Sequence, residues 1–412
     1  MNEVEEILQK IIQIRDDGAC ETRVADYLIR LLQIHDIKTR VIRFSGNCSG
    51  FIAEIGNNRG PVLAFVGHED TTLLDNSTEQ ATVPANDSKV DRKIYGQEVA
   101  GLEVSLAAAV LALIELKEKK VPLKGKFRVY GTIGNENSTV GIRKMIAAGL
   151  ASDLDALVVS EPSGMKIQTL AKIAPKLEKL GIISKNDAVE LLKRNQIVEQ
   201  HFLESARRGA LSYDVISQGK ATQSSSCVEA NAINSLLAFI QEQNTYFENL
   251  SNQESLILGP TTPVITKISG SKQLRTMPEK AKLSVFVRTI PEISNEQLIK
   301  QLEQIIKGIN LKFSAKLSLK INFKHEPLIL SPDSRISQIT RKVSEQQLHQ
   351  KLTFIGTANG KNASQFVRTN PRLDVLVIGP GNASYQVNQY VNSKVFRNFI
   401  KIYEEVTTEY LQ

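Results

Sequence analysis

The sequence has no tryptophan, only three cysteines, and no apolar run near the ~20 residues that cross a membrane as a helix. Cys20, Cys48 and Cys227 are too few and too scattered for a disulfide framework or a CxxC zinc site. A basic segment followed by an apolar run is also missing near residue 1. We therefore expect neither a signal peptide nor a membrane span, and a cytoplasmic protein.

Aromatic residues make up only 6% of the chain, and its formal net charge of +7 comes from lysines and arginines spread along the whole sequence. Because nucleic-acid binding usually needs basic side chains gathered in a patch or block, this distribution argues against a nucleic-acid partner. The 412 residues are 42% hydrophobic and 23% charged. This composition is typical of a globular protein, and the length predicts two or three domains.

Residues 61–70, PVLAFVGHED, are the stretch that is most informative about function. The continuous apolar run at residues 62–66 predicts a strand buried on both faces, as in a parallel sheet covered by helices. His68, Glu69 and Asp70 follow this strand, at the edge where open α/β sheets bind their ligands. A turn with merely solvated polar residues explains these three side chains equally well.

Helical and strand patterns alternate through the first 160 residues. The predicted strands cover residues 39–44, 51–55, 61–66, 126–132 and 156–159, and the strongest predicted helices cover residues 104–118 and 142–150. This βαβ succession predicts an α/β domain with a mostly parallel sheet covered by helices.

Residues 166–208 have the pattern of helices with polar breaks, and we interpret them as a helical excursion between domains. Strands at residues 211–217, 263–268, 281–288 and 311–323 then alternate with helices, the first of them at residues 229–241. Ser294 and Gln297 predict a capping box at the second helix. The βαββαβ order favours an inserted, ferredoxin-like α+β domain over residues 209–325. A helix after Pro332 and a strand at residues 375–378 complete the first domain, which is therefore split between residues 1–165 and 326–412.

Seven motifs carry a resemblance to a known family. In order along the chain they are GHED (67–70), IYGQEVAGLEVSLAA (94–108), GTIGNENSTVG (131–141), SEPSG (160–164), GKATQSS (219–225), VRTIPE (287–292) and GPGNASYQVNQYV (379–391). Over nearly its full length the chain resembles the zinc-dependent family of acetylornithine deacetylase, succinyl-diaminopimelate desuccinylase and related aminoacylases and carboxypeptidases. The resemblance implies a metallohydrolase-like domain with an inserted lid and dimerisation domain, and hence a homodimer. A shared fold does not by itself establish a shared activity.

The family's chemistry needs two zinc ions, held by a bridging Asp, two histidines and two further carboxylates, with a Glu as general base and a histidine from the lid. Zinc lowers the pKa of its bound water to ~7, and the Glu accepts the proton of that water. By resemblance, His68 is one metal ligand and Asp70 is the carboxylate that orients it. Glu136 and Glu161 match the two terminal carboxylate ligands.

Four other positions of that site differ from the family pattern. The bridging Asp is replaced by Gly101, the general base by Asn135, the second metal histidine by Tyr385, and the lid histidine by Gln223. Loss of a general base alone lowers a rate by roughly 10²- to 10⁴-fold. We therefore expect a degraded two-metal site that holds either no metal or a single weakly bound Zn²⁺.

Arg288 matches an arginine that clamps the substrate carboxylate in the family, because a guanidinium binds a carboxylate through two parallel hydrogen bonds. A structural ion pair at the end of a strand fits Arg288 equally well. The family's Asn in a VNxIP-like segment is Arg275 here, which puts the family's substrate in doubt. His201 is the one other histidine that we consider as a replacement metal ligand.

Two functions remain open from the sequence. The first is a non-catalytic homologue that keeps the fold and binds a carboxylated small molecule or a partner protein. The second is an active metal-dependent amidohydrolase, of the deacetylase, desuccinylase or dipeptidase type, that acts on N-acyl amino acids or small peptides with a rearranged site. Metal analysis beside a panel of N-acyl amino acids distinguishes them.

Overall fold

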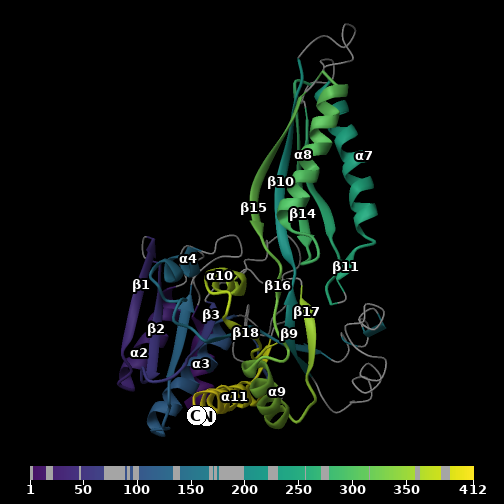
Figure 1. Cartoon of the computed structure of the whole chain (residues 1–412). Helices are drawn as coiled ribbons and strands as arrows, with labels where there is room; N and C mark the ends of the chain where they lie inside the picture. Colours follow the sequence, from purple (N-terminus) through teal and green to yellow (C-terminus); the bar gives the residue numbers. More distant parts are fainter. Residues whose placement is uncertain are drawn as a thin grey trace.

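The computed structural model describes residues 3–14, 22–45, 48–68, 89–90, 93–95, 102–132, 140–166, 170, 174–175, 199–220, 231–255, 257–270, 278–314, 316–357, 362–381 and 390–412. These residues form a broad α/β domain and an elongated second domain that stands over it (Figure 1). Within this part of the chain, every helix is too short or too polar to cross a membrane.

A mixed sheet of ten strands is the centre of the larger domain. Its strands, in spatial order, are β1 (Thr39–Ser45), β2 (Cys48–Gly56), β6 (Lys126–Thr132), β3 (Val62–His68), β7 (Ala156–Val159), β18 (Asp374–Val377), β9 (Glu199–Arg207) and β16 (Leu328–Ile329), with β17 (Thr353–Thr357) and β8 (Gly164–Lys166) also paired to β9. Strands β6, β3, β7 and β18 are parallel, whereas β1, β2, β9 and β16 each pair antiparallel to a neighbour. The carboxyl ends of the four parallel strands therefore meet at one edge of the sheet.

Helices cover both faces of this sheet, as the apolar run in β3 predicts. They are α1 (Glu3–Gln13), α2 (Thr22–Ile34), α3 (Leu102–Glu118), α4 (Val140–Ala147), α9 (Arg335–Leu348), α10 (Asn362–Thr369) and α11 (Ser393–Leu411). Leu63 and Phe65 pack with α1, α2, α3 and α11 on one face, while Ala64 and Val66 pack with α4 and α10 on the other. These four side chains, at residues 63–66, are completely buried, which confirms the prediction of a strand buried on both faces.

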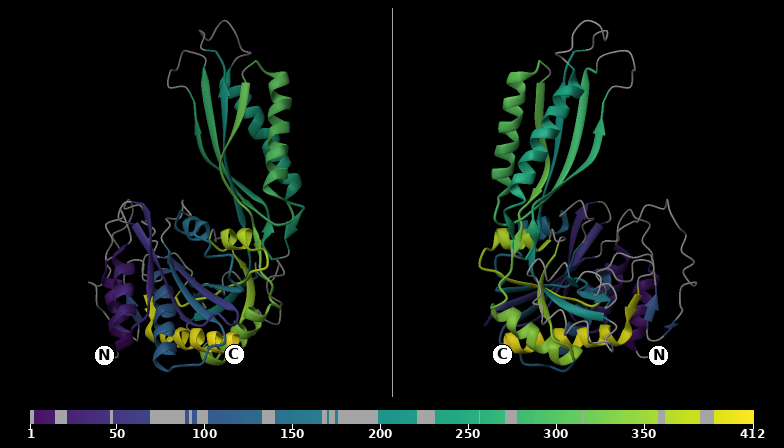
Figure 2. Two further views of the ribbon diagram at one scale, coloured as in Figure 1. Left: turned by 60° about the vertical axis from the view of Figure 1, so that its left-hand side comes forward. Right: turned by 90° about the vertical axis from the view of Figure 1, so that its right-hand side faces the viewer.

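The second domain has a four-stranded antiparallel sheet with helices on one face only (Figure 2). Its elements are β10 (Gly209–Gln218), α7 (Ala232–Leu250), β13 (Thr262–Ser269), β14 (Lys280–Thr289), α8 (Asn295–Lys312) and β15 (Lys316–His325). The spatial order of the strands is β13-β14-β10-β15. The predicted capping box is confirmed, since the side chains and backbones of Ser294 and Gln297 bond to each other at the start of α8. We call this domain the lid.

Two neighbouring segments connect the domains. Strand β9 continues into β10 with only Arg208 between them, and β15 returns to β16 through Glu326 and Pro327. Gly209 lies where the two segments are closest: a Cβ there would be 2.5 Å from the carbonyl oxygen of His325 and 2.6 Å from the nitrogen of Pro327. Only glycine fits this close approach of two backbones.

The structure differs from the prediction in the start of one lid strand and in two short additional sheets. Helix α8 runs to Lys312, so the last lid strand begins at Lys316 rather than at residue 311. Two short sheets were not predicted: β4 (Lys89–Val90), β5 (Lys93–Tyr95) and β19 (Tyr390–Asn392) form one, and β11 (Glu254–Ser255) and β12 (Gly259–Pro260) form the other.

The prediction of helix for residues 166–208 is wrong at its C-terminal end. Residues Glu199–Arg207 form β9, a strand of the main sheet in which all nine residues are buried. The segment EQHFLESAR looks too polar for a buried strand, but partners elsewhere in the fold bind its polar groups. The amide of Gln200 donates to the carbonyl of Lys351 at 2.9 Å, and the backbone nitrogen of His201 donates to Gln350 at 2.8 Å. Most of the remaining predicted excursion lies outside the described residues.

Candidate functional site

The edge formed by the carboxyl ends of β3, β6, β7 and β18 holds the described parts of the predicted metal site. Strand β3 ends at His68, whose backbone pairs with Thr132 of β6. Glu161 follows β7 by two residues, and the backbone nitrogen of Ser160 donates to the carbonyl of Val66 at 2.8 Å. Gly379 packs so closely against Glu161 that a Cβ on it would lie 2.6 Å from the Glu161 carbonyl oxygen.

The short pair of strands β5 and β19 links two further site segments. Tyr95 of β5 pairs with Tyr390 of β19. Gly101 follows β5 in the sequence and Tyr385 precedes β19. The residues between β5 and Gly101 and between Tyr385 and β19 lie outside the described part of the chain.

Seven of the residues singled out in the sequence lie outside the described residues: Asp70, Gly101, Asn135, Glu136, Gln223, Arg275 and Tyr385. His68 is described by its backbone alone. The roles given to these residues therefore stay predictions, and the geometry of the site is built from Glu161 and its neighbours.

Glu161 forms an ion pair with Arg207, the last residue of β9. Nη2 of Arg207 lies 2.6 Å from Oε2 of Glu161, and Nη1 lies 3.4 Å from Oε1. The third donor, Nε, is 2.7 Å from Oε2 of Glu204, which also accepts a hydrogen bond from the Thr357 hydroxyl at 3.0 Å. Only 1% of the Arg207 side chain is exposed, against 16% of Glu161 and 10% of Glu204. One buried guanidinium therefore bridges two carboxylates.

Burial and charge act in opposite directions in this cluster. Burial alone lowers the pKa of Arg207, but Glu161 and Glu204 outweigh this effect and raise it above its ordinary value. Burial raises the pKa of Glu204, although the charge of Arg207 opposes the shift. Arg207 consequently remains charged, between the carboxyl groups of Glu161 and Glu204.

This arrangement competes with the two-zinc site that the resemblance implies. Both oxygens of Glu161 accept hydrogen bonds from Arg207, so a zinc ion would share this carboxylate with a guanidinium. A permanent positive charge in the same buried cluster also opposes the approach of a divalent cation. Among the residues that the structure describes, no three His, Cys, Asp or Glu side chains are grouped as metal ligands.

His201 is a core histidine in this structure. It lies on β9 with Nδ1 3.0 Å from the Ser163 hydroxyl and its ring centroid 5.1 Å from that of Phe399. Complete burial lowers its pKa to about 3, so the ring is neutral at physiological pH. Nε2 has no hydrogen-bond partner within the described part of the chain.

Arg288 lies at the base of the lid, on the face of the sheet that α7 and α8 leave open. Its guanidinium stacks on the ring of Phe286 at 4.8 Å from the ring centroid. Arg208 lies close by, with Nη1 3.0 Å from the Thr262 hydroxyl. Burial and then the charge of Arg288 lower the pKa of Arg208, so two guanidinium groups share this region.

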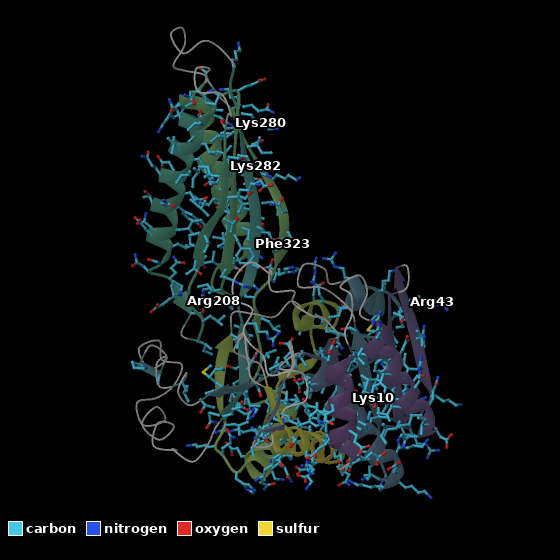
Figure 3. The ribbon with its side chains drawn as sticks, turned by 180° about the vertical axis from the view of Figure 1, so that it is seen from behind. Lys10, Arg43, Arg208, Lys280, Lys282 and Phe323 are labelled. Carbon is cyan, nitrogen blue, oxygen red and sulfur yellow. The ribbon has the colours of Figure 1, made fainter. Side chains whose placement is uncertain are left out.

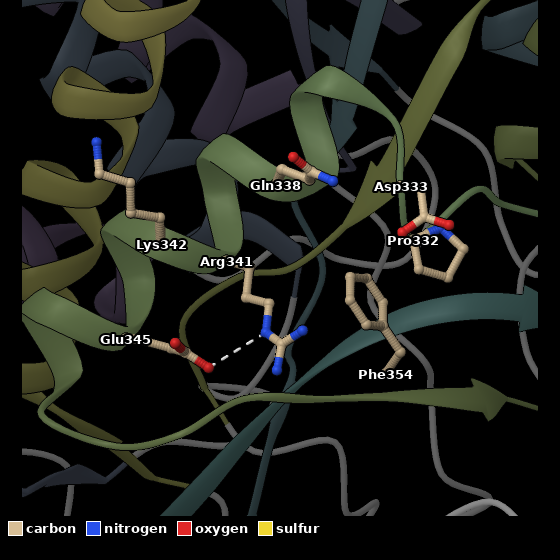
Figure 4. A pocket seen from close by; sticks show the side chains of 7 residues that line it. All are labelled: Pro332, Asp333, Gln338, Arg341, Lys342, Glu345 and Phe354. Carbon is tan, nitrogen blue, oxygen red and sulfur yellow. Dashed lines mark hydrogen bonds and ion pairs between the residues drawn. The ribbon is translucent and has the colours of Figure 1, made fainter.

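A surface cavity of about 330 Å³ lies between α9 and β17 (Figure 4). Its lining includes Arg341, Glu345 and Phe354, with Nε of Arg341 3.3 Å from the Glu345 carboxylate. None of the residues predicted for the site lines it. We therefore assign this cavity no part in the site.

Sequence reasoning missed Arg207. Its partner Glu161 is 46 residues away, and the only local signal is the pair of arginines before Gly209, which looks like a charged turn. Arg207 is buried because it is the last residue of β9, a strand inside the main sheet.

Comparison with protein families agrees with the fold. A family model described as Peptidase family M20/M25/M40 matches residues 64–409. A curated relative from Staphylococcus aureus, described as probable succinyl-diaminopimelate desuccinylase, is 26% identical over 99% of this chain and 97% of its own length. A Staphylococcus epidermidis protein with the same description is 23% identical over 98% of this chain and 97% of its own.

Solved structures with the same architecture are more distant in sequence. The aminopeptidase PepT of Bacillus cereus superposes with a TM-score of 0.74 at 12% identity and covers 99% of this chain and 98% of its own. A metallo-carboxypeptidase of Sulfolobus solfataricus gives 0.72 at 15% identity, covering 100% and 99%. A Bacillus subtilis protein described as a dinuclear metal binding peptidase gives 0.70 at 15% identity, covering 99% and 97%.

Proposed function

Since the chain belongs to peptidase family M20/M25/M40, we propose that it is a member with a degraded two-metal site, inactive or strongly impaired as a hydrolase. Four groups that the family's chemistry requires are replaced, by Gly101, Asn135, Gln223 and Tyr385. The observation that carries the proposal is the ion pair of Glu161 with Arg207. In this ion pair, Glu161, one of the remaining candidate metal ligands, binds the guanidinium of Arg207.

The electrostatics support this proposal. In an active dinuclear site the negative charge of the carboxylate ligands stabilises two divalent cations. Here the bridging carboxylate is absent, and Glu161 compensates a guanidinium instead. His68 remains at one metal position and Glu136 at the other, so at most a single ion is expected, held weakly and completed by Asp70, Glu98 or water.

We further propose that the protein keeps a site for a carboxylated small molecule at Arg288. The half-buried side chain of Arg288 lies on the open face of the lid, with Arg208 nearby. The two guanidinium groups give this region a positive charge that suits a carboxylate. A hydrolase that loses its metal ligands but keeps the residues that bind its substrate would still bind that ligand without hydrolysing it.

Homodimer formation through the lid is also part of the proposal. Strand β13 is an edge of the lid sheet, and its apolar side chains Ile265 and Ile268 are exposed by 42% and 57%. Ile233 and Leu237 of α7 are exposed by 37% and 49%. An exposed apolar edge strand favours pairing with a second chain.

The alternative is an active amidohydrolase with a rearranged site, acting on N-acyl amino acids or small peptides. The similarity to probable desuccinylases over 99% of the chain favours it. The two functions are separated by measuring the zinc or cobalt content of the purified protein together with its hydrolysis of N-acetyl and N-succinyl amino acids. Turnover that depends on added metal would establish the alternative.

A further inference from the structure

The open face of the lid sheet is organised in rows that run across all four strands. The register places Thr262, Arg288, Ala210 and His325 side by side at the base. The next row consists of Val264, Phe286, Ser212 and Phe323. In the row beyond it, Lys267, Ser284, Asp214 and Lys320 lie together.

The second row is apolar although it does not face the helices. The alternate residues of β10 and β14, such as Leu211 and Val285, pack with α7 and α8 in the lid core. Phe286 and Phe323 lie on the other face, with ring centroids 6.0 Å apart above the small side chain of Ser212. Val264 is 54% exposed and Phe323 is 36% exposed. We call Val264, Phe286 and Phe323 the apolar band.

The rows on either side of the band carry different charged groups. Toward the tip, the row holds the carboxylate of Asp214 with Lys267 and Lys320, and this carboxylate accepts from Ser284 at 2.7 Å and from Lys282, two residues further along β14, at 2.8 Å. Toward the base, the row carries Arg288, with Arg208 beside it. Figure 3 shows this order along the lid, from Lys280 and Lys282 through Phe323 to Arg208.

An apolar surface next to a guanidinium suits a ligand that has an apolar group at one end and a carboxylate at the other. Exposed apolar side chains gathered in one place mark binding surfaces more often than single exposed residues do. Successive rows on one face are about 7 Å apart, because they are two residues apart along a strand. This spacing suits an amino-acid derivative whose carboxylate meets Arg288 while its side chain covers the band.

We propose that the open face of the lid binds a small carboxylate that carries an aromatic or branched apolar side chain. Arg288 binds the carboxylate, and Phe286, Phe323 and Val264 contact the side chain. This inference rests on the proposed carboxylate site at Arg288 and adds the chemical class of the ligand. It differs from the polar, doubly charged compound that the description of the staphylococcal relatives suggests.

Binding of three probe compounds tests the proposal without any turnover. They are N-acetyl-L-phenylalanine, N-acetylglycine, which lacks the side chain, and N-acetyl-L-phenylalanine amide, which lacks the carboxylate. Dissociation constants are measured on the full chain by calorimetry and ligand-observed NMR. We expect N-acetyl-L-phenylalanine to bind about tenfold more tightly than either analogue, since burial of a phenyl group and a paired carboxylate each give at least this factor.

Two variants with matched controls assign the contacts. Phe323→Ser should remove the preference for phenylalanine over glycine, whereas Leu311→Ser, at an 83% exposed apolar residue on α8, should keep it. Arg288→Gln should remove the preference for the acid over the amide, whereas Lys280→Gln, at the far end of the same strand, should keep it. Circular dichroism confirms that each variant is folded.

Several results would overturn the inference. N-acetylglycine could bind as tightly as N-acetyl-L-phenylalanine, or N-succinyl-diaminopimelate, measured as a fourth compound in the same assay, could bind more tightly. Phe323→Ser could keep the preference for phenylalanine, or could shift from dimer to monomer, which would assign the band to a second copy of the chain. Absence of binding at millimolar concentration would also contradict it. Hydrolysis of the probe would instead refute the proposed inactivity and leave the ligand class intact, so the two failures are distinguishable.

Discussion

Nη2 of Arg207 lies 2.6 Å from Oε2 of Glu161, although the two residues are 46 positions apart in the sequence. The pair joins the end of β9 to the segment after β7, at the edge of the sheet where the resemblance predicts the metal site. A buried arginine with two carboxylate partners is fixed in place by its own hydrogen bonds. It therefore gives Glu161 a structural role that needs no metal ion.

Removal of this arginine should strongly destabilise the fold. Arg207→Ala leaves Glu161 and Glu204 together in a buried place without a cation, and loss of one partner of a buried ion pair costs about 3–5 kcal/mol. Urea unfolding at neutral pH measures the change in the free energy of unfolding. The double variant Arg207→Ala/Glu161→Gln should be less destabilised than the single variant, because it removes one of the uncompensated charges.

Arg341→Ala is the matched control. Arg341 pairs with Glu345 at 3.3 Å, but both side chains are substantially exposed, by 42% and 32%. An exposed pair of this kind contributes roughly 0–1 kcal/mol. If Arg207→Ala were no more destabilising than Arg341→Ala, the structural role given to Arg207 would be wrong.

The pH dependence of stability should reveal His201 as a core residue. Burial lowers the pKa of His201 to about 3, from 6.5 in the unfolded chain. Between these values the unfolded state binds a proton that the folded state does not, so stability is lost as the pH falls below 6.5. At pH 5 the loss from this residue is about 2 kcal/mol.

His201→Gln should remove that part of the acid sensitivity. Urea unfolding of the parent and the variant at pH 7, 6 and 5 measures the difference in slope. His349→Asn, at an exposed residue that ends α9 with φ of 54°, serves as the control and should retain the slope of the parent. Parallel curves for the parent and His201→Gln would show that the imidazole is accessible to protons.

Charge on the edge strand of the lid should prevent dimerisation. Ile268 is 57% exposed on β13, so Ile268→Glu is tolerated by the monomer but places a carboxylate in any interface that the edge forms. Sedimentation velocity at micromolar concentration should show a dimer for the parent and a monomer for the variant. Leu311→Glu, at an exposed residue of α8, should remain dimeric. A monomeric parent would refute the dimer directly.

The sequence predicts those helices and strands whose buried residues are apolar, because their spacing then shows in the sequence. The strand at residues 126–132 was predicted with the bounds that the structure gives to β6, and Ser294 and Gln297 cap α8 as expected. Strand β9 could not be predicted in this way, since Glu199, Gln200 and Arg207 are buried only because distant residues bind them. Periodicity detects apolar burial, whereas the partners of a buried polar strand are set by tertiary structure.

The candidate site shows the same division. The SEPSG motif makes Glu161 a candidate metal ligand by resemblance, and that role stays a prediction, whereas its close contact with Gly379 is known only from the structure. The ion pair of Glu161 with Arg207 is not predictable, because the sequence pattern of residues 199–207 does not indicate a buried strand. Arg288 lies on its predicted strand, but the aromatic ring under it became visible only through the register of the lid sheet.

Restoring the family's ligands should restore metal binding. Gly101→Asp with Tyr385→His supplies the bridging carboxylate and the missing imidazole. Neither substitution alone should raise the metal content towards two, because the second ion needs both of these groups. Addition of Asn135→Glu and Gln223→His should then give weak hydrolysis of an N-acyl amino acid, measured by release of the free amine.

The zinc content of the parent and of the Gly101→Asp/Tyr385→His variant, after incubation with excess Zn²⁺ and dialysis, tests the degraded site most directly. We predict at most one weakly held ion per chain in the parent and a rise towards two in the variant. Two tightly bound ions per chain in the parent would contradict the account, because Glu161 would then bind metal in preference to Arg207.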